Sequence, residues 1–154
     1  MSQFRVIPIP DGVSAAVRAT LRAPGYGHPA HVEVATGYGP CRACLRTFRE
    51  GHEERVLFTH DAFAGVDGYP SPGPVFIHHQ ACEPWRVDGF PPEVAALPLM
   101  LEAYGAGRWP VAREPARGEQ VEPAVARLLA NPAVAYLHVR NAEAGCYIAR
   151  VERA

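Results

Sequence analysis

Three of the four cysteines in the chain share one stretch of sequence with two adjacent histidines. Cys41 and Cys44 are separated by two residues, a spacing that lets one turn of backbone direct both sulfur atoms at one metal ion. Cys82 follows His78 and His79 at a similarly short distance along the chain. Thiolate and imidazole ligands together suit zinc better than most other metals in a cell. We therefore predict a metal site formed by Cys41, Cys44, His78 and Cys82, with zinc as the ion that fits it.

Strand alternation decides between the two histidines. The apolar run at 75–79 is typical of a β-strand, in which successive side chains point to opposite faces of the sheet. Val75 and Ile77 then share one face with His79, and His78 lies on the other. We choose His78 as the ligand because Val75 and Ile77 can then pack against an apolar layer that contains no ring nitrogen. His79 is kept as an additional candidate.

The cysteine pattern departs from that of a paired zinc ribbon in two respects. Leu45 stands where glycine usually follows the second cysteine of a zinc knuckle. The interval of 33 residues between Cys44 and His78 is also longer than in common zinc fingers. The same thiols therefore have a simpler interpretation, as buried reduced cysteines that behave as small hydrophobic side chains.

Redox chemistry is a further alternative. Cys41 and Cys44 have the spacing of a dithiol pair, and Arg42 or Arg46 could stabilise a thiolate in a thiol-dependent oxidoreductase. Thioredoxin-like sites place such a pair at the start of a long helix, whereas Gly51 interrupts the chain soon after Cys44. Serine-hydrolase, phosphate-loop and His-Glu-x-x-His motifs are absent from the sequence, which leaves open whether the chain is an enzyme.

Two other groups of residues could extend or replace this site. Cys146 is a candidate ligand if the fold brings it beside the strand at 75–79, and otherwise it is a small buried strand residue. Arg42, Arg46 and Arg140 suggest a binding module for a small anion, because the guanidinium fork suits carboxylates and phosphates. That hypothesis requires the three arginine side chains to converge in space.

The overall composition is that of a globular protein. A chain of 154 residues, 48% hydrophobic and 20% charged, can bury the core of a single domain. The net charge of −1 gives no reason to expect a nucleic acid or an anionic membrane as partner. Every basic residue is arginine, which excludes Schiff-base and P-loop lysine chemistry. The sequence shows neither a signal peptide nor a spanning helix, so we expect a cytoplasmic protein with reduced thiols.

The elements that position these residues follow from short alternating runs broken by glycine and proline. We expect helices over 13–21 and 123–130. We expect strands at 4–9, 31–35, 55–59, 75–79, 134–140 and 146–151, an edge strand within 108–118, and a strand or short helix at 97–104. Hairpin signals outnumber βαβ units, which predicts an α+β domain over 1–154 with six or seven short strands in a mostly antiparallel sheet and two helices.

Three sequence blocks also carry a family resemblance. They are Pro-Cys-Arg-x-Cys-Leu-Arg at 40–46, Gly-Pro-Val-Phe-Ile-His at 73–78 with Cys82 after it, and Val-Arg-Asn-Ala-x-x-Gly-Cys at 139–146. In this order they resemble the bacterial family catalogued as domain of unknown function 1203. The resemblance extends from about Gly39 onward. It implies one complete domain, and it brings no established activity to the chain.

Overall fold

The computed structural model describes residues 3–68 and 70–154, and it confirms the expected α+β class. In chain order its elements are β1 (Phe4–Ile7), α1 (Asp11–Thr20), β2 (His31–Val34), β3 (Glu54–Asp61), β4 (Pro72–His78), α2 (Pro92–Ala95), β5 (Leu99–Tyr104), β6 (Pro110–Ala116), a 3-10 turn (Gly118–Gln120), α3 (Val121–Ala130), β7 (Tyr136–Asn141) and β8 (Tyr147–Arg153). The eight described strands exceed the six or seven predicted, because both ambiguous segments, 97–104 and 108–118, form strands.

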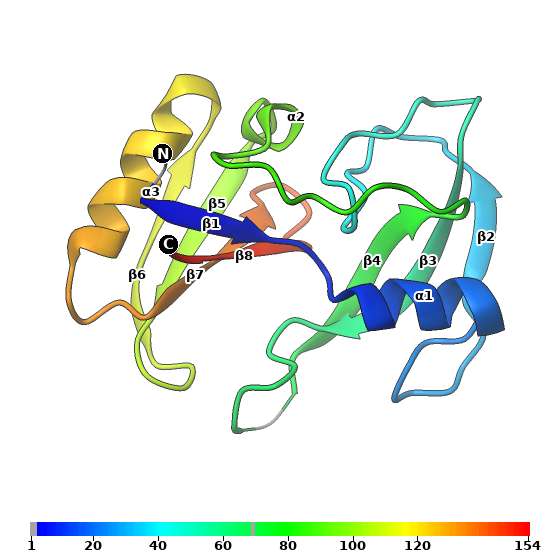
Figure 1. The fold of residues 1–154 in the computed structure, drawn as a ribbon, viewed down its shortest axis with the longest axis horizontal. Helices are drawn as coiled ribbons and strands as arrows, with labels where there is room; N and C mark the ends of the chain where they lie inside the picture. Colours follow the sequence, from blue (N-terminus) through cyan, green and yellow to red (C-terminus); the bar gives the residue numbers. More distant parts are fainter. Residues whose placement is uncertain (1–2, 69) are drawn as a thin grey trace.

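The strands form two sheets rather than one. The larger has the order β1-β8-β7-β5-β6 and the smaller the order β2-β3-β4, with antiparallel pairing throughout (Figure 1). The chain enters through β1, crosses to the smaller sheet for α1 to β4, and returns to the larger sheet for the remaining elements. No described helix is long and apolar enough to cross a membrane.

One face of the five-stranded sheet is covered by α2 and α3 (Figure 1). The buried residues of α3, namely Val121, Ala124, Val125 and Leu129, recur at the spacing that places them on one side of a helix. They meet aliphatic side chains of the central strands, among them Leu101, Leu137 and Val139, which are all fully buried. Burying each such side chain stabilises the fold by about 1.5–3 kcal/mol.

The opposite face of this sheet is polar and aromatic. Glu102 pairs with His138 across β5 and β7, and alternation turns both away from the helices. His138 is nonetheless fully buried, because Phe63 covers it from the loop after β3. Ring centroids of Phe63, Tyr104 and Tyr147 lie 4.6, 5.1 and 5.0 Å from that of the histidine.

The three-stranded sheet packs against α1, which contributes the fully buried Val17 (Figure 1). Val56 and Phe58 of β3 and Val75 and Ile77 of β4 supply the sheet's side of this core, as the strand alternation predicts. The same cluster includes Cys41, Ala43 and Cys44 from the long connection between β2 and β3. The cysteine turn is therefore part of the smaller core.

Candidate metal centre

The four predicted ligands come from three separate segments. Cys41 and Cys44 lie in a tight turn between β2 and β3, His78 is the last residue of β4, and Cys82 follows in an irregular segment. Two backbone hydrogen bonds close the turn, from Leu45 N to Cys41 O at 2.9 Å and from Cys41 N to Arg46 O at 2.9 Å. The turn is joined to β4 by a bond from the Arg42 N–H to the Phe76 carbonyl at 3.0 Å.

Leu45 takes the backbone conformation that glycine usually supplies in a zinc knuckle. Its φ is 58°, in the left-handed region that costs a residue with a Cβ about 1–2 kcal/mol. Its side chain is 1% exposed and packs into the core of the five-stranded sheet, and such burial contributes about 1.5–3 kcal/mol. The absence of glycine therefore does not prevent the knuckle conformation, since burial of the leucine offsets the backbone strain.

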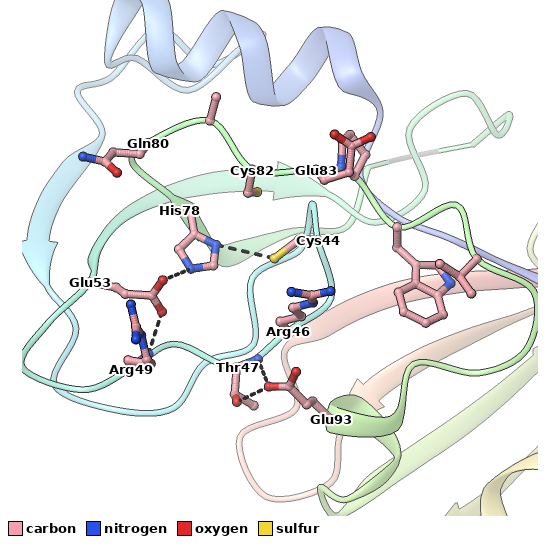
Figure 2. Close-up of a pocket in the computed structure, with 14 residues that line it drawn as sticks. Cys44, Arg46, Thr47, Arg49, Glu53, His78, Gln80, Cys82, Glu83 and Glu93 are labelled. Carbon is pink, nitrogen blue, oxygen red and sulfur yellow. Dashed lines mark hydrogen bonds and ion pairs between the residues drawn. The ribbon is translucent and has the colours of Figure 1, made fainter.

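The distances between donor atoms fit a single tetrahedral ion. Sγ of Cys41 lies 3.8 Å from Sγ of Cys82. Sγ of Cys44 lies 3.5 Å from Nδ1 of His78 (Figure 2). All four donor atoms lie within 4.8 Å of one another. Tetrahedral zinc with ordinary bond lengths separates two sulfurs by about 3.8 Å and a sulfur from a nitrogen by about 3.6 Å. The cluster could therefore bind a metal ion.

Hydrogen-bond donors surround the sulfur atoms. The backbone N–H of His78 donates to Cys41 Sγ at 3.3 Å, and Nη2 of Arg18 donates to Cys82 Sγ at 3.3 Å. Nε of Arg18 also donates to the carbonyl of His78 at 3.0 Å, which ties α1 to the end of β4. Such donors favour thiolate over thiol, and the thiolate is the form that binds metal.

A carboxylate orients the histidine. Nε2 of His78 lies 3.1 Å from Oε2 of Glu53, although the angle is not that of a regular hydrogen bond. With Nε2 directed at Glu53, Nδ1 of the same ring faces Cys44 (Figure 2). The other oxygen of Glu53 accepts the Arg49 N–H at 2.7 Å, which lowers the pKa of this carboxyl against the opposing effect of burial. A ligand histidine held by a carboxylate through its second nitrogen is common in metal sites. No spacing in the sequence singles out Glu53 or Arg18, because strand pairing and helix packing bring them here.

Proton affinities within the cluster are strongly perturbed. Hydrogen bonds to Cys41 and Cys82 raise the pKa of His78 to about 10, and burial opposes this shift. Burial raises the pKa of Cys41, but hydrogen bonds from Cys44, Cys82 and His78 outweigh it and lower the pKa overall. The pKa of Cys44 is raised by its hydrogen bonds to Cys41 and Cys82, so these shifts favour negative charge on the Cys41 sulfur, next to a histidine whose proton affinity is raised.

Comparison with known proteins assigns the family. The model of a family described as "Protein of unknown function (DUF1203)" matches residues 38–153. The chain belongs to this family. No curated protein and no solved structure gives a significant match. The part of the DUF1203 chain that matches includes all four residues of the cluster, whereas Arg18 lies before it.

Two additional candidates in this DUF1203 chain lie outside the cluster. His79 follows the end of β4, and its Nδ1 lies 3.5 Å from Oε1 of Glu54. Cys146 precedes β8 and lines a separate cavity of about 240 Å³ with His60 and Tyr147. Neither residue is among the four whose donor atoms lie together. The choice of His78 over His79 therefore agrees with the geometry.

The three arginines of the anion hypothesis do not converge within the described residues. Arg42 is 4% exposed and donates to the carbonyls of Tyr147, at 2.8 Å, and Pro40, at 2.7 Å. Arg46 lines a cavity of about 520 Å³ beside the cluster, and Arg140 lines cavities on the larger sheet. An anion site formed jointly by all three is therefore wrong, because Arg42 is buried with its donors on backbone carbonyls, and Arg46 and Arg140 line different cavities.

The dithiol alternative meets two obstacles in the DUF1203 fold. Cys41 is fully buried and Cys44 is 7% exposed, whereas an attacking thiol must reach its substrate. No helix follows the pair, since residues 45–49 have no regular secondary structure. The geometry favours ligation over thiol exchange.

Proposed function

We propose that this DUF1203 chain is a zinc-binding protein whose ion is structural, and that the domain serves for interaction or ligand binding. The observation that carries the proposal is the agreement of the Cys41–Cys82 and Cys44–His78 donor distances, 3.8 and 3.5 Å, with the edges of a zinc tetrahedron. Four protein ligands fill that coordination shell. Sites of this kind stabilise a fold, whereas catalytic zinc keeps one position open for water or substrate.

The charge of the surroundings supports the same proposal. Zinc with three thiolates and a neutral imidazole carries a net charge of about −1. Arg18 donates to one of these sulfurs, and the guanidinium of Arg42 is buried next to Cys41 in the chain. Arg42 forms no ion pair with a carboxylate in the described part of the chain. The carbonyls of Pro40 and Tyr147 accept hydrogen bonds from this guanidinium, and negative charge on Cys41 would further offset the cost of burying it.

When bound, zinc would supply folding free energy by joining the cysteine turn, the end of β4 and the segment of Cys82. Contacts within the protein position these three segments before any metal binds. Glu53 orients the imidazole of His78, and Arg18 connects α1 to both later ligands through the Cys82 sulfur and the His78 carbonyl. The proposed role is thus the fixing of loops that have little regular secondary structure.

The test is elemental analysis of protein purified without added metal. We expect about one zinc per chain in the wild type, and loss of that zinc in Cys41→Ser and Cys82→Ser. Cys146→Ser is the matched control, because it removes a thiol that lies outside the cluster, and it should retain the metal. Sub-stoichiometric metal in the wild type, or equal loss in the Cys146 variant, would contradict the proposal.

A further inference from the structure

A second hollow lies on the face of the five-stranded sheet that the helices leave uncovered. Its volume is about 560 Å³, within the usual range for small-molecule sites. Side chains that line it and bear on its chemistry are Phe63, Glu102, Tyr104, Arg108, Arg113 and Arg140, which we call the arginine cleft. None of them lines the cavity beside the metal cluster. The arginine cleft is therefore independent of the proposed zinc site.

Three guanidinium groups from three places in the fold meet in this cleft. Arg108 comes from the turn between β5 and β6, Arg113 from β6 and Arg140 from β7. Glu102 is the one carboxylate among the described lining residues. It already accepts Nε of Arg140 at 2.7 Å and the hydroxyl of Tyr104 at 3.0 Å. Among the described lining residues, arginines thus outnumber carboxylates by three to one, in a chain whose net charge is −1.

Two of these arginines are held in place before any ligand arrives. Arg140 is fixed by Glu102 and by a bond from its Nη1 to the Gly145 carbonyl at 3.0 Å. The guanidinium carbon of Arg108 lies 4.0 Å from the ring centroid of Phe63. Arg113 is exposed and forms no ion pair with the residues described. Guanidinium groups that are already ordered lose less entropy when they bind an anion.

The floor of the cleft favours negative charge as well. His138 lies beneath it, with its ring centroid 4.6 Å from Phe63 and 5.1 Å from Tyr104. Burial and, after it, the charges of Arg140, Arg150 and Arg108 together lower the pKa of His138 to about 3, against the opposing charge of Asp61. The positive potential that disfavours a proton on this imidazole would attract an anion above it.

We propose that the arginine cleft binds a small organic anion with at least two carboxylate or phosphate groups, whose body packs against Phe63 and Tyr104. Guanidinium forks bind both groups through paired N–H donors, so the chemistry of recognition is shared. A single small anion would leave most of the hollow unfilled and would use one fork, whereas a divalent ligand can reach Arg113 and Arg140 together.

The test is a titration of the full-length chain, followed by backbone amide NMR, with succinate and separately with fructose 1,6-bisphosphate. We expect saturable shifts at 102–113 and 138–145 with at least one of the two anions. The anion that saturates identifies the preferred group. Arg113→Gln should weaken binding by about tenfold or more, because it removes one charge-assisted contact. This exposed side chain has no ion-pair partner among the described residues, so its loss should leave the fold intact.

Arg127→Gln is the matched control. It removes the same charge from an exposed arginine of α3, which pairs with Glu114 rather than with the cleft. Binding should be unchanged in this variant. Absence of saturation by either anion up to about 10 mM, or equal weakening in the two variants, would overturn the proposal.

Discussion

The two sheets of this protein are stabilised in different ways. Among the residues that the structure describes, the five-stranded sheet has a core cluster of twenty buried apolar residues, drawn mainly from strands and α3. The corresponding cluster of the three-stranded sheet has twelve, and two of these are the cysteines Cys41 and Cys44. A small sheet with one covering helix buries little apolar area, and such units often need a metal or a disulfide. The comparison supports our proposal that metal ligands stabilise the smaller sheet, where buried hydrophobic area is limited.

The largest expected effect is that of metal removal. A chelator should abolish hydrogen-exchange protection of β2, β3 and β4 while β5, β7 and β8 stay protected, because only the smaller sheet depends on the ion. Structural zinc can contribute about 10 kcal/mol or more in isolated zinc-finger peptides, so the loss should exceed that of any single core substitution. Exchange measured by mass spectrometry checks this, with added zinc as the reversal. Equal loss of protection in both sheets would show that the two sheets do not differ in their dependence on the metal.

Shortening a side chain in the core of the larger sheet should lower stability without affecting metal binding. Leu101 is fully buried in the central strand β5, and Leu101→Ala should reduce the free energy of unfolding by about 2–5 kcal/mol. The zinc content should stay that of the wild type, because the leucine is not part of the smaller core. Urea denaturation with elemental analysis of the same sample tests both statements, and loss of metal in this variant would show that the two cores depend on each other.

Acid should act on the larger sheet through His138. Its pKa is about 3 in the folded chain and near 6.5 when exposed, so below pH 6.5 the unfolded state takes up a proton that the folded state refuses. Stability is therefore lost as the pH falls from 6.5 toward 3, by about 2 kcal/mol at pH 5. The charged and titratable groups around the ring are Asp61, Tyr104, Arg108, Tyr136, Arg140, Tyr147 and Arg150.

His138→Phe isolates this effect from acid release of metal. The variant keeps an aromatic ring among Phe63, Tyr104 and Tyr147. It removes two ring nitrogens that have no hydrogen-bond partner in the described part of the chain. Urea denaturation at pH 7.5 and pH 5 should show about 2 kcal/mol less acid destabilisation than in the wild type. If the free energy of unfolding changes between pH 7.5 and pH 5 by the same amount in the variant and the wild type, then the acid sensitivity belongs to the smaller sheet and not to His138.

The smallest expected effect concerns the carboxylate that holds the ligand histidine. Glu53→Gln should weaken zinc binding by about tenfold, equivalent to about 1.4 kcal/mol of metal-linked stability. Glu54→Gln is the control, because Glu54 contacts His79 instead. Competition with a zinc-binding dye measures both affinities. If the two variants have the same zinc affinity, then Glu53 does not orient the metal ligand.

Much of this fold could be predicted from local pattern. Alternation and turn residues were sufficient for β7 and β8. Cysteine spacing together with strand alternation singled out the four residues whose donor atoms lie within 4.8 Å of one another, and their role as metal ligands stays a prediction. Periodicity did not decide whether 97–104 is strand or helix, since apolar and polar residues there fit both, and pairing of β5 with β6 and β7 makes it a strand. The four-residue α2 is too short to have a periodic pattern.

What could not be predicted depends on contacts between distant residues. Glu53 and Arg18 reach His78 and Cys82 only through strand pairing and the packing of α1. The conformation of Leu45 is visible only once the larger core is in place, because its side chain belongs there. The same contact supports our proposal that both sheets belong to one domain.

Leu45 has its backbone in the sulfur-bearing turn and its side chain in the opposite hydrophobic layer. Burial of this leucine already fixes one side of the turn before any ion binds. The proposed ion and the buried leucine would then hold the same short turn from two sides, one through four donor atoms and the other through hydrophobic contact.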